Sequence, residues 1–311
     1  MRVAITGSNG FIGQNLCNAL KNNSHKIRQL VRYDQHNSID SFSVGDISHN
    51  TDWSKALEDV DCIIHCAGLA HNLHRSKNLN LTSFEEINVL GTINLAEQAS
   101  RLGVNRMVFL SSLKVNGDLT TTDRPFTEKS IPKPRGEYAQ SKWDAEQKLR
   151  EISSTSKLDV ITVRPPLVYG PGVKANFLYL LKAVSLGLPL PLGSIDNRRS
   201  FISVDNLTDF LIACITKPEA CGKTFLVSDD EDISTSYLIE SMAKLMNKPS
   251  RLFYLPKKFM HLGGFLINKE NMIRSLVDSL QVDISYTKKT LSWEPKYTLQ
   301  ESLKNTIDSL L

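Results

Sequence analysis

The chain has 311 residues, of which 41% are hydrophobic and 23% are charged, and its formal net charge is +4. This length and apolar content are typical of a globular protein with one large or two modest domains. The lysines and arginines are scattered, without the long basic runs that indicate a nucleic-acid partner.

The sequence gives no sign of a membrane or secretory segment. Gly7 and Gly10 interrupt any apolar run near the start, and no later stretch reaches the roughly 18–20 apolar residues that a membrane span needs. The five cysteines show neither metal-ligand spacing nor a disulfide framework. His71 and His74 lack a third nearby ligand, so we expect no metal. We expect a cytoplasmic protein with no membrane partner.

In chain order, the first half alternates buried strands with helices. Strand patterns are predicted at residues 3–5, 26–32, 43–45, 62–66, 106–110 and 158–163. Helical patterns follow the first glycine turn and recur at residues 53–59, 84–102 and 137–152. This alternation predicts a doubly wound α/β fold, a parallel Rossmann sheet with helices on both faces. Ligands of such sheets bind at the carboxyl ends of the strands.

The pattern changes after Pro165 and Pro166. Further helices are predicted at residues 176–186, 206–216, 236–246 and 272–280, joined by shorter segments rich in proline and glycine. We interpret this half as a smaller C-terminal α/β lobe that binds the substrate. The predicted division is 1–165 for the dinucleotide-binding domain, with 200–228 packing back on it, and 166–199 with 229–311 for the lobe.

The first strand is followed by the sequence TGSNGFIG at residues 6–13. Its glycines allow close approach of the backbone to a pyrophosphate, and the helix that begins there offers N–H donors to the anion. Within a βαβ unit, this arrangement predicts dinucleotide binding.

The end of the second strand bears on the choice of cofactor. Arg32 would favour a 2′-phosphate, as in NADP, through charge-assisted hydrogen bonds. Asp34 would instead suit the free ribose hydroxyls of NAD if the strand ended slightly later. Arg28 and Arg32 are alternatively ordinary surface residues.

Two further patterns carry chemistry. Tyr138 and Lys142 are four residues apart in a predicted helix and therefore share one face, where the ammonium would favour the phenolate. Ser111 and Ser112 stand at the carboxyl end of a predicted strand, where a hydroxyl can bind a reacting oxygen. Alone, the tyrosine and lysine are equally consistent with a helix surface.

Together, the glycine loop, the strand-end serine and the later tyrosine and lysine resemble the short-chain dehydrogenase/reductase superfamily. The spacing TGxxGxxG points to its extended branch, the nucleotide-sugar epimerases and dehydratases. The resemblance implies Ser112, Tyr138 and Lys142 as catalytic residues. It implies as cofactor-binding residues Gly7, Gly10, Phe11, Ile12, Gly13, Arg32, Asp46, Ile47, Cys66, Ala67, Gly68, Asn88, Ser111, Tyr138, Lys142 and Pro165.

The sequence RPPLVYGPG at residues 164–172 is similar to a signature of nucleotide-sugar enzymes. By the same resemblance, Arg199 would bind the diphosphate of the substrate, with Arg274 as a second phosphate ligand. Asn176 and Leu190 match segments that contact the diphosphate and uracil. From its position beside Ser112, Lys114 would add positive charge near the reacting sugar, and the alternative is a surface role.

The resemblance implies oxidoreductase chemistry at C4 of a UDP-activated sugar. Leu113 and Lys114 replace the acidic pair of 4,6-dehydratases, so that reaction lacks its acid and base. We expect a homodimeric, NAD(P)-dependent 4-keto-sugar reductase of bacterial polysaccharide synthesis, with NADPH favoured over NADH. The alternatives are a 4-epimerase with tightly bound NAD and, more remotely, a redox-inert NAD(P) sensor.

Overall fold

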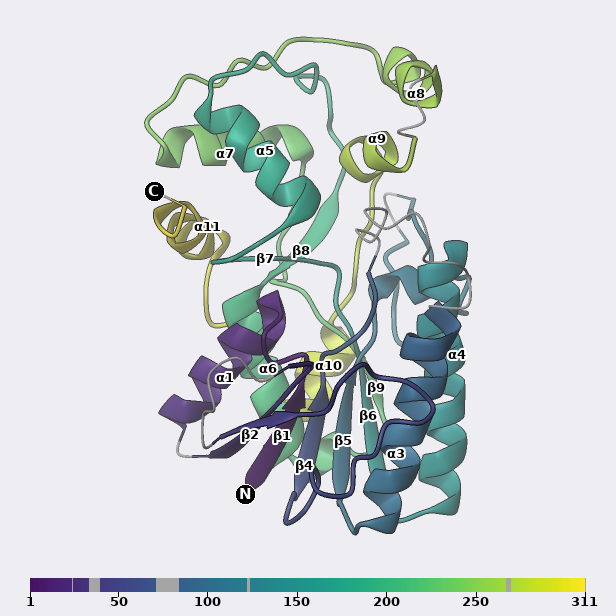
Figure 1. Ribbon diagram of the computed structural model, residues 1–311. Coiled ribbons are helices and arrows are strands. Elements are labelled where there is room, and N and C mark those ends of the chain that lie inside the picture. Colours follow the sequence, from purple (N-terminus) through teal and green to yellow (C-terminus); the bar gives the residue numbers. More distant parts are fainter. Residues whose placement is uncertain (24, 34–39, 71–83, 122–123, 267–269, 311) are drawn as a thin grey trace.

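Alternating buried strands and amphipathic helices form a parallel sheet with helices on both faces (Figure 1). The structure is a computed structural model that describes residues 1–23, 25–33, 40–70, 84–121, 124–266 and 270–310. The strands of the large sheet are β1 (Arg2–Thr6), β2 (Lys26–Val31), β3 (Ser41–Ser43), β4 (Cys62–His65), β5 (Arg106–Leu110), β6 (Asp159–Arg164) and β9 (Thr224–Leu226). Their order is β3-β2-β1-β4-β5-β6-β9, and every neighbouring pair is parallel. This is the doubly wound Rossmann arrangement that the sequence predicts.

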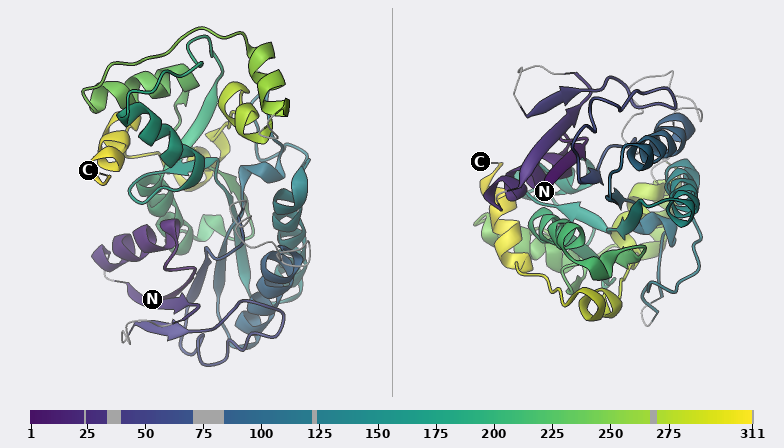
Figure 2. Two further views of the ribbon diagram at one scale, coloured as in Figure 1. Left: turned by 45° about the horizontal axis from the view of Figure 1, so that its top comes forward. Right: turned by 90° about the horizontal axis from the view of Figure 1, so that it is seen from below.

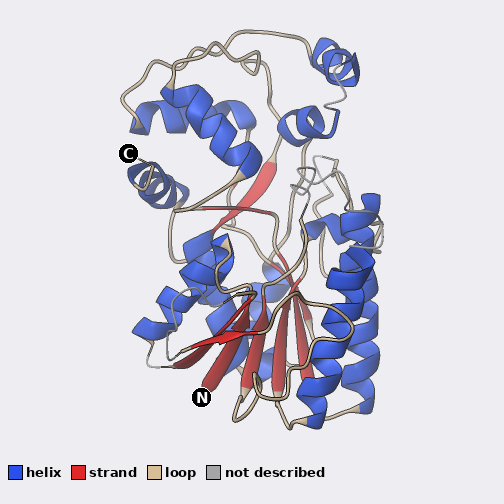
Figure 3. Ribbon diagram, viewed as in Figure 1, coloured by secondary structure: helices blue, strands red, loops and turns tan. Residues whose placement is uncertain are grey.

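Two helical layers cover this sheet, one on each face (Figure 3). One layer holds α1 (Phe11–Asn22), α6 (Val204–Thr216) and α10 (Ser285–Leu291), and the other holds α3 (Gly91–Arg101) and α4 (Gly136–Thr155). Successive residues of a strand face opposite helical layers. Val3 and Ile5 pack against the first layer, whereas Ala4 packs against the second. Burial on both faces explains why these strands are almost continuously apolar.

The remaining elements build a smaller lobe over the carboxyl ends of the strands (Figures 1 and 2). Its sheet has the order β10-β8-β7, made of β7 (Leu167–Tyr169), β8 (Arg199–Ser203) and β10 (Asp232–Ile233). Its helices are α5 (Ala175–Ser185), α7 (Thr235–Leu245), α8 (Lys257–Leu266), α9 (Glu270–Val277) and α11 (Leu299–Asp308). A separate apolar cluster, which includes Phe177, Leu238 and Leu303, forms its core.

Some local predictions differ from the structure. Residues 53–59 form turns instead of a helix, with Asp59 in the left-handed region at φ 55°. The amides of Asn94 and Gln98 on α3 both donate to the carbonyl of Thr51 and hold this segment against that helix. The strand predicted at residues 43–45 lies at β3, two residues earlier, and Gly45 (φ 69°) follows it.

The end of the chain also differs from the predicted division. Leu291 and Trp293 were assigned to the lobe, but they pack in the cluster beneath the large sheet, beside Phe210 of α6. The reason is visible in the bonding of α10, because the Thr287 hydroxyl donates to the Leu226 carbonyl of β9. The 229–311 segment therefore contacts both parts of the molecule.

Candidate active site

The glycine loop joins β1 to α1 and leaves no space for a side chain at Gly7 or Gly13. At Gly7, which has φ 65°, an added Cβ would lie 2.8 Å from the backbone nitrogen of Ala67. At Gly13 it would lie 2.2 Å from the carbonyl oxygen of Gly7. The Gly10 N–H donates to that same carbonyl (2.8 Å). The loop is therefore a tight backbone cradle at a helix N-terminus, which suits a pyrophosphate.

A cavity of about 400 Å³ opens beside this loop, at the carboxyl ends of β1, β2 and β4. Seven residues predicted to bind the cofactor line it, namely Gly7, Gly10, Arg32, Ile47, Cys66, Ala67 and Gly68. The cavity is also lined by residues that the sequence does not single out, which are Asn9, Leu30, Val31, Tyr33, Val44, Gly45, Leu69 and Ile87. Most of these lie at or beside the ends of predicted strands. That position is the feature of the sequence from which they could be predicted.

Nine predicted cofactor residues do not line this cavity, and three of them, Phe11, Ile12 and Pro165, belong to the packing around it. Phe11 and Ile12 pack against the two apolar clusters on either side of α1. Pro165 is buried, and its carbonyl accepts a hydrogen bond from the Leu113 N–H (2.9 Å). These residues support the walls of the site without lining the cavity.

An ion pair marks one rim of this cavity. The Arg32 Nε lies 2.8 Å from Oδ1 of Asp46, with the two side chains 60% and 62% exposed. The Tyr33 hydroxyl donates to the same carboxylate at 3.5 Å. The alternative candidate Asp34 lies outside the described residues, as do His71 and His74. Within the described ranges, no group of three or more potential ligands is placed to hold a metal ion.

Buried polar side chains fix the strand ends around the cavity. His65 is hydrogen-bonded through Nδ1 to the Thr6 hydroxyl (2.6 Å) and through Nε2 to the Thr92 hydroxyl (2.9 Å). Burial, aided by the charge of Lys142, lowers the pKa of His65 to about 3. The ring is thus neutral at physiological pH and holds β1, β4 and α3 together.

Asn88 lies in η2 (Glu85–Leu90), a π-helical turn that leads into α3. Its side-chain amide donates to the Leu69 carbonyl (3.2 Å) and to the Ser141 hydroxyl (3.0 Å), and its oxygen accepts from the Leu69 N–H (2.8 Å). Asn88 therefore ties the cavity wall to α4, the helix that carries Tyr138. Widened helical turns of this kind occur often at functional sites.

The three predicted catalytic residues converge above β5. The Tyr138 side chain is hydrogen-bonded to that of Ser112, and burial raises the pKa of Tyr138 against the smaller opposing effect of this bond. The Lys142 ammonium donates to the Leu110 carbonyl (3.1 Å) and lies 4.8 Å from the centroid of the Phe109 ring. Burial lowers the pKa of Lys142 to about 8, while the neighbouring Cys66 and Glu146 side chains act to raise it.

The neighbouring Ser111 plays a different part. Its hydroxyl donates to the Glu146 carboxylate (2.5 Å), which is also bound by Arg164 through Nε (2.9 Å) and Nη2 (2.5 Å). The Ser111 hydroxyl therefore points into the core. The Arg164 and Glu146 side chains are 3% and 0% exposed. We did not predict this buried pair, because α4 and β6 meet only in the fold.

The predicted substrate residues occupy the smaller lobe and the loop after β5. Lys114 is paired with Asp118 (2.7 Å), and Arg274 on α9 with Glu270 (2.6 Å). Arg199 at the start of β8 is buried and donates to the Asp278 carbonyl (2.8 Å). No contact joins these three cations to one another among the described residues, which leaves their shared role a prediction.

Asn176 and Leu190 were also predicted to contact the substrate. Asn176 is exposed in the first turn of α5. Leu190 is partly buried and bonded to a second segment: its N–H donates to the Arg251 carbonyl (2.9 Å), and its carbonyl accepts from the Phe253 N–H (3.0 Å). The structure does not bring these two residues to the cofactor cavity.

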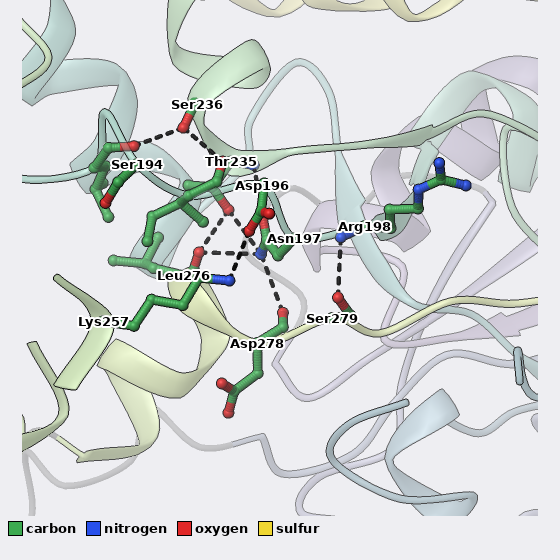
Figure 4. A network of polar contacts seen from close by, with 12 residues as sticks. Ser194, Asp196, Asn197, Arg198, Thr235, Ser236, Lys257, Leu276, Asp278 and Ser279 are labelled. Carbon is green, nitrogen blue, oxygen red and sulfur yellow. Dashed lines mark hydrogen bonds and ion pairs between the residues drawn. The ribbon is translucent and has the colours of Figure 1, made fainter. Parts of the chain in front are cut away.

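A polar network fixes the backbone just before β8 (Figure 4). The Asn197 amide donates to the Thr235 hydroxyl (3.2 Å) and to the carbonyls of Leu276 and Asp278 (3.1 Å each). The Arg198 N–H donates to the Ser279 hydroxyl (3.0 Å). The position of Arg199 is therefore set by α7 and by the segment that follows α9.

The fold and this site define the class of protein. A parallel Rossmann sheet with a glycine cradle after β1, and serine, tyrosine and lysine above β5, is that of an extended short-chain dehydrogenase/reductase. The chain belongs to the NAD dependent epimerase/dehydratase family, whose model matches residues 3–228. It is thus an NAD-dependent enzyme of nucleotide-sugar chemistry.

Individual relatives and one solved structure show which proteins this chain is similar to. The chain is 41% identical to a UDP-glucose 4-epimerase of Vibrio cholerae, over 99% of this chain and 95% of that one. It is 24% identical to an N-acetyl-alpha-D-glucosaminyl-diphospho-ditrans,octacis-undecaprenol 4-epimerase of Escherichia coli O157:H7, over 85% and 78%. The crystal structure of a UDP-glucuronic acid 4-epimerase from Bacillus cereus with NAD has the same fold, with a TM-score of 0.81, 22% identity, and coverage of 100% and 98%.

Proposed function

We propose that this enzyme is a UDP-hexose 4-epimerase that keeps NAD bound between turnovers. The observation that carries the proposal is the 41% identity with a UDP-glucose 4-epimerase along nearly the whole of both chains. We expected a 4-keto-sugar reductase from the sequence alone. The relatives support the epimerase alternative better, and nothing in the comparisons favours the redox-inert sensor.

The geometry of the cavity fits the dinucleotide. A side chain at Gly7 or Gly13 would clash with the backbone, and one at Gly10 would lie tightly against the Gly7 carbonyl, which suits a pyrophosphate bound at the N-terminus of α1. Ile47 and Ala67 supply apolar walls, and Lys142 lies within reach of the same cavity, since a Cβ on Gly68 would be 3.1 Å from its Nζ. When bound there, NAD would accept a hydride from the sugar and return it.

The side chains above β5 would move the proton. In the oxidising half of the reaction, the Tyr138 phenolate takes the proton of the C4 hydroxyl while the C4–H bond breaks. In the reducing half, Tyr138 returns that proton to the C4 oxygen after the sugar has presented its other face. Ser112, bonded to Tyr138, would donate to the C4 oxygen as its charge changes.

Tyr138 needs positive charge to act as a base, because burial raises its pKa. Lys142 is one helical turn away and would supply this charge when protonated. We further propose that Arg199 and Arg274 bind the substrate diphosphate, for which Arg274 would exchange Glu270 for the phosphate. Leu113 and Lys114 offer no acid–base pair for loss of the 6-hydroxyl, so a dehydratase remains unsupported.

We also propose NAD over NADP as the working cofactor. A 2′-phosphate placed at Arg32 would meet the Asp46 carboxylate as well, because the two side chains are 2.8 Å apart. The preference for NADPH that Arg32 alone predicted is not supported by the comparisons. A tightly held NAD is also what an epimerase requires, since its reduced form must not leave before the hydride is returned.

A direct assay tests the proposed activity. Purified enzyme, with no cofactor added, should interconvert UDP-glucose and UDP-galactose or their N-acetyl forms, as followed by chromatography of the nucleotide sugars. Tyr138→Phe should lower the rate by about 10²–10⁴-fold while the co-purified NAD stays bound. Stoichiometric oxidation of added NADPH by a 4-keto sugar, with no interconversion, would instead establish the reductase.

A further inference from the structure

The helix α8 (Lys257–Leu266) presents an apolar face to solvent at the far end of the smaller lobe (Figures 1 and 2). Phe259, Leu262, Phe265 and Leu266 are 62%, 54%, 68% and 71% exposed. At 100° per residue these four side chains lie within one third of the helix circumference. Apolar side chains exposed singly are common on protein surfaces, but a contiguous stripe usually marks an interaction site.

The opposite face of α8 is firmly packed, so this exposure is not due to a poorly seated helix. Met260 is buried, and a Cβ on Gly264 would lie 2.7 Å from Cγ1 of Ile273 on α9. At the start of the helix, the Lys257 ammonium is paired with Asp196 (2.7 Å; Figure 4). These contacts fix the orientation of α8, and the apolar stripe on its outer face takes no part in them.

The chain segment that carries this stripe is basic. Residues 241–269 contain no aspartate or glutamate, and their charged side chains are Lys244, Lys248, Arg251, Lys257, Lys258 and Lys269. Within the described residues, Lys248, Arg251 and Lys258 form no ion pair. Carboxylates reach the region from other segments: Asp196 faces Lys257, Asp278 lies 3.6 Å from His261, and Glu270, whose Cα lies beside Gly264, is paired with Arg274 (2.6 Å).

The segment before α8 adds aromatic side chains to the same end of the lobe. Phe253 and Tyr254 are 48% and 73% exposed. Phe253 is held by backbone hydrogen bonds to Leu190 (3.0 Å) and from Gly193 (3.0 Å), and the Leu255 carbonyl accepts from the Ser194 hydroxyl (2.9 Å). Aromatic side chains beside lysines and an apolar helix face are the composition that binds at the headgroup level of a bilayer.

We propose that α8 and residues 251–255 dock the enzyme on the surface of an anionic phospholipid membrane. The apolar stripe enters the boundary between headgroups and acyl chains, and Lys248, Arg251 and Lys258 meet the lipid phosphates. A symmetric contact with a second copy would set these cations against one another, which disfavours self-association through this face. The proposal concerns this surface alone and does not depend on the catalytic reaction.

Vesicle flotation with the full-length enzyme tests the proposal. The enzyme should float with vesicles of phosphatidylcholine and phosphatidylglycerol, should float much less with phosphatidylcholine alone, and should be partly released by added salt. The double substitution Leu262→Ser with Phe265→Ser should weaken binding at least about tenfold, because each side chain withdraws apolar area from water on docking. Lys258→Glu should weaken binding to the anionic vesicles alone.

The matched control replaces two apolar side chains that are at least as exposed, on α5 and just after it. Tyr179→Ser with Leu186→Ser should bind vesicles as the wild type does. Bound nucleotide and thermal unfolding verify that each variant folds. Failure of the wild type to bind anionic vesicles, or equal binding by the α8 variant, would overturn the proposal. Loss of a dimer in light scattering, without any vesicle binding, would show that a second copy covers this face.

Discussion

Lys142 is buried, and burial of its ammonium group costs free energy. Burial lowers its pKa to about 8, and the Glu146 carboxylate, four residues along α4, opposes that shift. Glu146 also accepts from the Ser111 hydroxyl (2.5 Å), directly before the proposed catalytic Ser112. This carboxylate is therefore a positioning residue that acts on the site through both the strand end and the lysine.

Replacing Glu146 with Gln should move the alkaline limb of the pH profile. Without the carboxylate the Lys142 ammonium is less stabilised, so its pKa falls and the charge that supports the Tyr138 phenolate is lost at lower pH. We expect the decline of kcat/KM at high pH to begin at a lower pH than in the wild type, with unfolding easier by about 3–5 kcal/mol because Arg164 loses its buried partner.

The control is Glu151→Gln on the same helix, where the carboxylate is 65% exposed and paired only with Lys148. It should leave both the pH profile and the stability close to wild type. An unchanged alkaline limb in Glu146→Gln, measured on folded enzyme, would show that Glu146 serves stability alone.

At the scale of elements, the glycine turn before α1 sets the approach of the cofactor. Gly13→Ala would place a methyl group 2.2 Å from the Gly7 carbonyl oxygen, so the turn must open to accept it. We expect at least about a tenfold loss in NAD affinity, equivalent to about 1.4 kcal/mol, as measured by the nucleotide retained on purification and by titration calorimetry.

Gly263→Ala provides the comparison, because a Cβ there meets nothing within 4 Å and alanine favours a helix. This variant should retain NAD fully. Equal retention by Gly13→Ala would contradict the role assigned to the turn.

Elements with a clear local pattern could be predicted from the sequence, and short elements fixed by distant contacts could not. Strands β1, β2, β4, β5 and β6 and the helices α3 and α4 have continuous apolar runs or helical periodicity, and the structure confirms them. Strand β9, which closes the large sheet, has three residues and is not among the predicted strands. Strand β10 has two residues and exists through its pairing with β8, so no local signal marks it. The turns at residues 53–59 carry a helix-like pattern that the amides of Asn94 and Gln98 override.

The residues of the candidate site also fall into two groups, those with a local sequence pattern and those that only the fold brings together. Glycine spacing and the Tyr138–Lys142 interval are local in sequence, and the Ser112–Tyr138 contact agrees with them. The pairs Glu146–Arg164 and Arg32–Asp46 join residues from separate elements, and only the fold brings them together. The choice between the two serines likewise needed the structure, because only there does the Ser111 hydroxyl turn toward Glu146.

At the scale of the whole molecule, the two parts are joined at several points. The smaller lobe has its own apolar core, whereas β9, α6 and α10 return to the large sheet. Within the described part of the chain, no helix is long and apolar enough to cross a bilayer. The proposed docking through α8 would thus bring the enzyme to a membrane from one end of the smaller lobe, on the side away from the Rossmann sheet.

The central claim is that one hydride leaves and returns to C4 within a single enzyme molecule. The most direct measurement uses UDP-glucose deuterated at C4, incubated with the enzyme and an excess of unlabelled NADH, followed by mass spectrometry and NMR of the product. We expect UDP-galactose, or the corresponding N-acetyl product from the N-acetyl substrate, to keep its deuterium at C4. Loss of the deuterium to the NADH pool, or a 4-keto sugar reduced only when NAD(P)H is supplied, would contradict the account.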